Sequence, residues 1–269
     1  MAVAHAAGGQ RSARLRHRRN VRTLTPGQLA SFRNAIAASQ AIKDDRGYLR
    51  WAGIHGLPLP ISCTHNSELF LPWHRAYLYF FEKSLQDRVP GVTLPWWNWT
   101  MRHGEGLPPA YKAAKSADGT PNPLRGSPIP PAGRGPGGPS RTTRNPGASG
   151  APPLPTLADV NRVLALSDFL DFQSQLEDIH NGVHVWVGGT MGSISTSAYD
   201  PVFWAHHTMI DRIWRLWQLR HPGSGPPPSL VNRALAPFAM TVRDTLDMDT
   251  LGYDYAVTTA ATGGTGGTS

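Results

Sequence analysis

Apolar residues recur at helical spacing over most of this chain. Thr25 and Pro26 suit the N-cap and the first turn of a helix, and Leu29, Phe32 and Ile36 then form one apolar face. Alternating patterns that would indicate strands are few. Further helical patterns are predicted over residues 48–55, 72–85, 157–164, 167–185 and 202–219. The patterning therefore predicts a mainly α fold with little β structure.

Three stretches interrupt or flank this helical pattern. Residues 104–155 are rich in proline and glycine and contain too few apolar side chains to offset their ordering entropy, so we interpret them as a long surface loop. Residues 1–20 are predicted to form a disordered basic arm, and residues 257–269 a disordered Gly/Thr tail. A single domain is expected over residues 21–256, with the loop as an insertion in it.

Composition narrows the class of protein. Of the 269 residues, 40% are apolar and 9 are tryptophan, which suits a compact aromatic core. No run of about 18 apolar residues occurs, so no membrane span is expected. The net charge of +8 is concentrated in residues 11–22 and 102–144. No recognition motif accompanies this charge, so nucleic-acid binding is not expected.

The N-terminal region and the cysteine content give information about the cellular compartment of the protein. Arg18 and Arg19 resemble half of a twin-arginine export signal, but Thr23-Leu24-Thr25-Pro26 follows where an apolar stretch is needed. We therefore expect a protein without its own signal peptide, which is cytoplasmic or is exported with a partner. The single cysteine, Cys63, excludes an intrachain disulfide and leaves the redox compartment open.

The candidate chemistry lies in two clusters of histidines on either side of the Pro/Gly-rich loop. His180 and His184 are four residues apart, so on a helix their imidazoles share one face, and Glu177 projects from that face too. The next helix begins with the adjacent pair His206 and His207, which supplies a third imidazole. Three imidazoles from two helices form a nitrogen-rich site that suits copper or zinc.

The other cluster consists of His55, His65 and His74. His74 lies within a predicted amphipathic helix, His65 precedes that helix, and His55 ends the helix before it. A lone histidine on an apolar face is usually a core residue, but two triads among Trp and Phe favour a pair of metal ions. Zinc hydrolases usually add a carboxylate, and only Glu177 is available for that role. Copper is therefore favoured, with a redox-inert zinc scaffold as an alternative.

Two segments that contain these histidines resemble motifs of type 3 copper proteins. Residues 63–75, Cys-Thr-His-Asn-Ser-Glu-Leu-Phe-Leu-Pro-Trp-His-Arg, continue to Glu82 and are similar to the first copper motif of the tyrosinase family. Residues 200–211 are similar to the second, in which the ligand lies four residues before the closing Asp211. This resemblance makes His207 the ligand.

Two shorter segments extend the resemblance. Residues 94–99, Leu-Pro-Trp-Trp-Asn-Trp, resemble the family's Pro-aromatic-Trp-Asp-Trp segment, with Asn98 in place of the usual aspartate. Tyr253-Asp254-Tyr255 resembles the Tyr-x-Tyr mark that closes the catalytic domain, and Arg22 is its expected partner. The resemblance runs from about residue 22 to residue 255, so residues 21–256 are predicted to be the tyrosinase catalytic domain.

The resemblance implies an antiparallel four-helix bundle core that holds two copper ions through six histidines. It also places a thioether between Cys63 and the ring of His65, because Cys63 lies two residues before that histidine; an inert small side chain is the alternative. Asp211 and His206 are expected to support the ligands from close by. The implied ligands are His55, His65 and His74 for one copper, and His180, His184 and His207 for the other.

The implied activity is that of a tyrosinase, with dioxygen as co-substrate and small phenols as substrates. In members that hydroxylate monophenols, a glutamate and an asparagine hold a water that takes the phenol proton, and Glu177 and Asn181 match them. The chain is therefore expected to hydroxylate monophenols to o-diphenols and to oxidise o-diphenols to o-quinones.

Two alternative functions stay open on the sequence. The chain could be a catechol or o-aminophenol oxidase without useful hydroxylation. It could also be an oxygen carrier like a hemocyanin functional unit, but such units cover the copper site with a further domain. Since this sequence ends soon after Tyr255, the enzyme is favoured. The resemblance also suggests a helper protein that delivers copper or carries the enzyme out of the cell.

Overall fold

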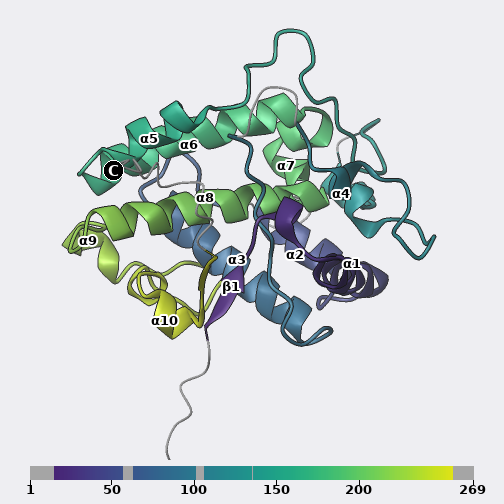
Figure 1. Cartoon of the computed structure of the whole chain (residues 1–269), viewed down its shortest axis with the longest axis horizontal. Helices are drawn as coiled ribbons and strands as arrows, with labels where there is room; N and C mark the ends of the chain where they lie inside the picture. Colours follow the sequence, from purple (N-terminus) through teal and green to yellow (C-terminus); the bar gives the residue numbers. More distant parts are fainter. Residues whose placement is uncertain (1–14, 57–62, 101–105, 135, 257–269) are drawn as a thin grey trace, which may run out of the picture.

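Four helices that carry the candidate ligands form the centre of the molecule. The computed structural model describes residues 15–56, 63–100, 106–134 and 136–256 (Figure 1). Helix α3 packs against α6 and α8, and α6 packs against α8 in turn. The predicted mainly α fold is confirmed. The bounds of these helices are α2 Tyr48–His55, α3 Phe70–Gln86, α6 Phe169–Val187 and α8 Pro201–Arg220.

Shorter elements surround the central helices. The one sheet among the described residues has two parallel strands, with Arg16 opposite Tyr253. The strands are β1 Arg16–Arg18 and β2 Tyr253–Tyr255. The other α-helices are α1 Pro26–Ala41, α4 Pro109–Lys112, α5 Leu157–Leu164, α7 Ile194–Ser197, α9 Pro228–Val231 and α10 Met248–Leu251. The 3₁₀ helices are η1 Val21–Thr23, η2 Pro123–Arg125, η3 Pro131–Gly133, η4 Gly189–Gly192 and η5 Arg243–Thr245.

Local sequence explains where the main helices begin. Thr25 and Gln28 form a reciprocal capping box at the start of α1, as the sequence predicts from Thr25 and Pro26. The Asp168 carboxylate accepts hydrogen bonds from the first backbone N–H groups of α6, and the Asp200 carboxylate accepts one from the start of α8. These caps satisfy donors that have no partner inside the helix and fix the ends of the ligand-bearing helices.

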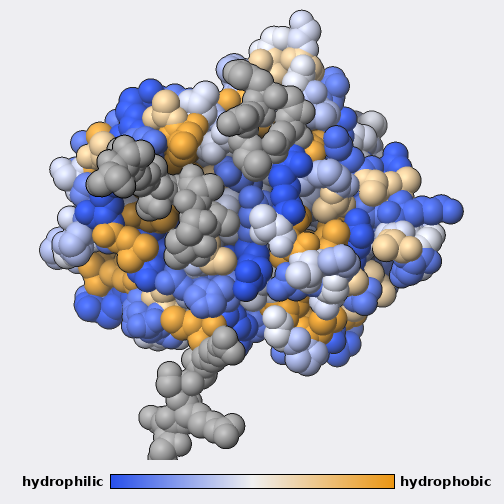
Figure 2. Space-filling view, viewed as in Figure 1, coloured by the Kyte–Doolittle hydropathy of each residue, from blue (hydrophilic) through white to orange (hydrophobic). Residues whose placement is uncertain are grey.

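Aromatic side chains fill the core between the helices. The rings of Phe81 in α3 and Trp204 in α8 stack with their centroids 3.6 Å apart. On the face shown in Figure 2, hydrophilic and hydrophobic residues are interspersed, as expected when the large apolar side chains lie inside. Among the described residues, no helix has both the length and the apolar character needed to cross a bilayer. The fully buried tryptophans are Trp73, Trp96, Trp97, Trp99, Trp204, Trp214 and Trp217.

The prediction that residues 1–20 form a disordered arm is wrong for residues 15–20. Arg18 lies in β1 and is completely buried; its guanidinium donates to Glu82 at 2.8 Å and to Asp211 at 3.1 Å. The reason is electrostatic, because buried carboxylates require a buried cation as partner. Residues 1–14 and the predicted tail 257–269 lie outside the described residues.

The expected pairing of Arg22 with the two tyrosines is also corrected. The guanidinium of Arg18 lies 3.7 Å from the centroid of the Tyr253 ring and donates to the hydroxyl of Tyr255. Arg22 donates instead to the carbonyl of Gly106. The parallel pairing of β1 with β2 brings Arg18 to the tyrosines, and such long-range register cannot be read from the N-terminal sequence.

Asp211 in α8 is the centre of this buried charge network. Its carboxylate accepts hydrogen bonds from Arg18 and Arg75 and from the hydroxyls of Tyr253 and Tyr255. Burial alone would raise the pKa of Asp211, but the charges of the two arginines outweigh burial and hold that pKa below its usual value. The network joins β1 and β2 to α8, one turn after His207.

The Pro/Gly-rich stretch is interpreted from its sequence as a long surface loop with too few apolar side chains to offset its ordering entropy, yet its described part does pack on the domain. Within its described part, the Arg144 guanidinium forms two hydrogen bonds of 2.6 and 2.7 Å to the Asp200 carboxylate, which also caps α8. Arg144 also donates to the carbonyls of Tyr111 and Leu124. One arginine, whose side chain is 10% exposed, thus organises a segment whose composition suggested no order. Its buried apolar residues are Leu107, Ala110, Tyr111, Leu124 and Ile129.

The end of the same stretch lies against the turn that follows α6. The N–H of Thr190 donates to the carbonyl of Thr143 at 2.9 Å, and the N–H of Asn145 donates to the carbonyl of Val187. Gly189 has a φ of 55°, and a Cβ there would lie 2.2 Å from the carbonyl oxygen of Thr143. Only glycine allows this close approach of the two backbones.

Candidate metal centre

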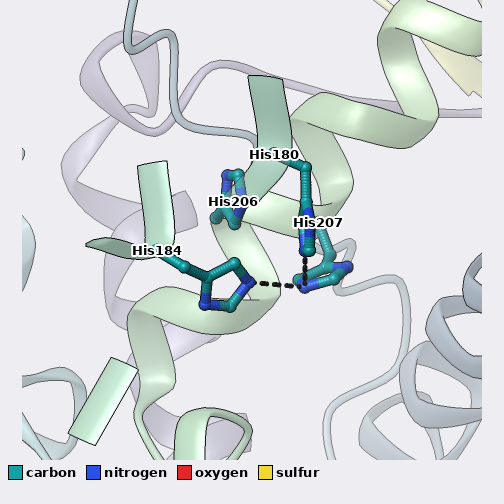
Figure 3. Close-up of side chains that lie close together, drawn as sticks. All are labelled: His180, His184, His206 and His207. Carbon is teal, nitrogen blue, oxygen red and sulfur yellow. Dashed lines mark hydrogen bonds between the residues drawn. The ribbon is translucent and has the colours of Figure 1, made fainter. Parts of the chain in front are cut away.

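The second histidine triad converges from α6 and α8. His180 and His184 lie one turn apart on α6, and His207 faces them from α8 (Figure 3). The Nε2 atom of His207 lies 3.2 Å from Nε2 of His180 and 3.2 Å from Nε2 of His184. The structure therefore brings together the three side chains that the sequence predicts as ligands of one metal ion.

The first triad comes from three separate parts of the chain. His55 ends α2, His65 lies in the segment before α3, and His74 lies in α3. The ring centroid of His65 is 5.3 Å from that of His55 and 5.3 Å from that of His74. The triads also touch, because the rings of His74 and His207 stack with centroids 4.6 Å apart. All six predicted ligands therefore form one continuous cluster.

Backbone carbonyls set the direction of three imidazoles. The Nδ1 atoms of His55, His74 and His184 lie 3.1, 2.8 and 2.8 Å from the carbonyl oxygens of Ile194, Phe70 and Met191. Because a carbonyl can only accept, each Nδ1 carries the proton and each Nε2 keeps its lone pair. The turn at residues 188–197 thus supplies two of these acceptors.

The lone pairs that result fit a bound metal cation. The Nε2 atoms of His55 and His74 are buried and have no hydrogen-bond partner among the described residues. Buried polar atoms without partners are costly, as are lone pairs that face each other at about 3 Å. A cation between the rings would remove both costs, since neutral imidazole is a good ligand for copper.

Burial keeps these imidazoles neutral. It lowers the pKa of His65 and of His184 to about 4. Burial, followed by the nearby histidines, holds the pKa values of His55, His74, His180 and His207 well below the usual value. Protons therefore do not compete with a metal ion for these nitrogens near neutral pH.

His206, expected from the sequence to support the ligands from close by, lies within the cluster of ligand nitrogens itself. It has a ligand nitrogen within 4.8 Å of those of His180, His184 and His207. Its ring stacks on that of His180 with centroids 5.0 Å apart, and both of its nitrogens are buried without a partner among the described residues. Figure 3 shows its ring beside the other three, outside the pair of contacts made by His207.

Glu177 and Asn181 lie at the edge of the cluster on α6. Glu177 is 5% exposed, and its Oε1 atom accepts a hydrogen bond of 2.8 Å from the N–H of Asn66, the residue after His65. Burial raises the pKa of this carboxyl. Asn181 is exposed, and its Oδ1 atom lies 3.1 Å from Nδ1 of His180. Glu177 also lines a cavity of about 390 Å³ that opens beside it.

Cys63 reaches the first triad. Its Sγ atom and the ligand nitrogens of His55 and His65 all lie within 4.8 Å of one another. Cys63 is partly buried, and burial raises the pKa of its thiol to about 12. The placement is compatible with the predicted thioether, which stays a prediction.

Gln173 is a residue near the site that the sequence did not indicate. It lies one turn before Glu177 on α6 and is 3% exposed. Its side chain hydrogen-bonds with the backbone of Ser67 and Leu71. The spacing is the signal that could have identified it, because a residue one turn before Glu177 and two turns before His180 lies on the same face of the helix.

Known sequences are similar to this chain over most of its length. A family model for the common central domain of tyrosinase matches residues 45–220, more than half of the chain. A tyrosinase of Streptomyces glaucescens is 32% identical over 79% of this chain and 86% of its own length. The hemocyanin units G and H of Sepia officinalis are 32% identical over 80% of the chain. The chain spans only 40% of the length of that hemocyanin.

Solved structures share the fold. A functional unit of octopus hemocyanin superposes with a TM-score of 0.76 at 30% identity, covering 89% of this chain and 68% of its own. A mushroom tyrosinase gives a TM-score of 0.74 at 22% identity, covering 90% of each chain, a likeness that concerns the fold alone. With the family model and the Streptomyces relatives, these findings show that the chain belongs to the tyrosinase family of type 3 copper proteins.

Proposed function

We propose that the chain is a tyrosinase that hydroxylates monophenols to o-diphenols and oxidises o-diphenols to o-quinones. His55, His65 and His74 would hold one copper ion. The other copper ion would be held by His180, His184 and His207. The bound pair of copper ions would supply the activation of dioxygen. The buried imidazoles contribute neutral nitrogen ligands whose lone pairs converge.

The observation that carries the hydroxylase part of this proposal is the position of Glu177. The carboxylate is buried beside the cluster, and Asn181 lies one turn further along the same helix face. One carboxylate oxygen accepts from the N–H of Asn66, and the other can hold a water shared with Asn181. Through this water the carboxylate would accept the proton of a phenol hydroxyl and leave a phenolate.

Oxygen uptake by the copper-loaded protein tests the activity. We expect uptake with a simple monophenol primed by a trace of catechol, and also with catechol alone. If catechol supports uptake and the monophenol does not, the proposal is reduced to a catechol oxidase, and o-aminophenol would then be the next substrate to test. Reversible oxygen binding without turnover would instead indicate a carrier, as the names of the hemocyanin relatives suggest.

The thioether gives an independent prediction. Its formation removes the Sγ hydrogen of Cys63 and a ring C–H hydrogen of His65, so the protein should be lighter by two hydrogens after it has been loaded with copper and exposed to air. Intact-mass measurement checks this, with a Cys63→Ala variant as the control that cannot change. An unmodified mass in the loaded parent would exclude the bond.

Partners beyond small phenols form a separate part of the proposal. A helper protein that delivers copper or accompanies export follows from the family resemblance and stays a prediction. Copper uptake by the purified chain alone, without any second protein, would make the delivery role unnecessary.

A further inference from the structure

Two buried side chains of α6 hold the segment that joins the ligands of the first triad. Glu177 accepts from the N–H of Asn66 at 2.8 Å. The amide oxygen of Gln173 accepts from the N–H of Leu71 at 3.1 Å, and the amide nitrogen of Gln173 donates to the carbonyl of Ser67 at 3.1 Å. Three bonds from adjacent turns of one helix therefore fix the backbone over residues 66–71.

This backbone has few local partners of its own. Leu69, at the N-cap of α3, provides no side-chain cap. The N–H of Phe70 donates to the carbonyl of Ser67 and residue 72 is a proline, so in the first turn of the helix the N–H of Leu71 is the one that needs an acceptor from elsewhere. Asn66 has a φ of 50°, a left-handed conformation that asparagine tolerates better than most residues. Gln173 supplies the acceptor for the N–H of Leu71, and Glu177 supplies the acceptor for the N–H of Asn66 in the segment before the helix.

The bonds connect ligands of both triads. His65 directly precedes Asn66, and His74 lies about one turn after Leu71 in α3. On the other side, His180 lies three residues after Glu177 on α6. A shift of the segment relative to α6 would therefore move ligands of one copper ion relative to ligands of the other.

We propose that Gln173 and Glu177 are positioning residues, an α6 clamp that holds the His65 segment and the start of α3 at the distance needed for a pair of copper ions. The inference rests on the proposed copper centre but not on which phenols react. For Glu177 it adds a second role to that of proton acceptor. Gln173 has the positioning role alone, because its amide cannot act as a base near neutral pH.

A substitution at Gln173 separates positioning from proton transfer. Gln173→Met keeps the length of the side chain but removes its hydrogen bonds. Gln175→Met on the exposed face of the same helix is the matched control. Residues that orient metal ligands typically contribute 10- to 100-fold to metal affinity. We expect about a tenfold faster loss of copper to a chelator in Gln173→Met, and faster amide exchange over residues 65–71 in the copper-free protein.

The ratio of monophenol to catechol turnover per bound copper should stay unchanged in Gln173→Met, since the proton acceptor is intact. Equal copper loss and equal amide exchange in the Gln173 and Gln175 variants would overturn the proposal.

Two substitutions at Glu177 supply a second test that does not depend on the folding of the Gln173 variant. Glu177→Gln keeps an oxygen acceptor for the Asn66 N–H, whereas Glu177→Ala removes it. We expect copper retention near that of the parent in Glu177→Gln and about tenfold faster loss in Glu177→Ala. Equal retention of copper in the two variants would contradict the proposed clamp. Unimpaired monophenol turnover in Glu177→Gln would contradict the role of Glu177 as proton acceptor, but it would not contradict the clamp.

Discussion

Replacement of Glu177 by glutamine is expected to slow the hydroxylation of a simple monophenol by about 100-fold. The amide cannot take the phenol proton, although it keeps the bond to the Asn66 N–H. Catechol oxidation should change much less, because the first hydroxyl of a catechol is more acidic and depends less on a base. Oxygen uptake per bound copper, measured with each substrate in turn, checks both expectations.

The neighbouring exposed carboxylate provides the control. Asp178→Asn removes the same charge from the outer face of α6 and should leave both rates nearly unchanged. Burial raises the pKa of Glu177, and only the carboxylate form accepts a proton, so hydroxylation in the parent should fall as the pH falls through this raised pKa. Comparable losses of monophenol and catechol turnover in Glu177→Gln would contradict the assigned role.

The second large effect concerns stability. Asp211→Ala should reduce the free energy of unfolding by about 3–5 kcal/mol, because it leaves the charges of Arg18 and Arg75 buried without their shared carboxylate. It also removes the acceptor of two tyrosine hydroxyls. Denaturant unfolding of the copper-free protein measures this loss without a contribution from metal binding.

A half-buried ion pair that involves strand β2 supplies the comparison. The Arg215 and Asp254 side chains are 24% and 22% exposed, so Asp254→Ala should cost no more than about 1 kcal/mol. A small effect at Asp211, similar to that at Asp254, would mean that the buried network adds little to stability.

Local sequence was sufficient to predict the helices that carry the site. The capping residue Thr25 and the four-residue spacing of His180 and His184 act within a few residues, so their consequences follow directly from the sequence. The convergence of six histidines on one cluster followed from the resemblance of the two copper motifs. In the structure these side chains do lie together.

Features that depend on distant partners could not be predicted in this way. Arg18 bonds to residues 64 and 193 positions away, and nothing near it in the sequence indicates burial. Arg144 orders the Pro/Gly-rich stretch through Asp200, although that composition predicts a solvated loop. Gln173 contacts a segment more than 100 residues earlier. Each of these residues is polar and bonds to a distant part of the chain, which the hydrophobic pattern cannot reveal.

The pairing of β1 with β2 has a consequence for the order of events during protein synthesis. Strand β1 leaves the ribosome among the first residues of the domain and β2 among the last, yet both meet at Asp211. Until β2 has emerged, the carboxylate of Asp211 in α8 lacks the two tyrosine hydroxyls that donate to it. The nascent domain should therefore reach its final compact state only after translation has passed Tyr255.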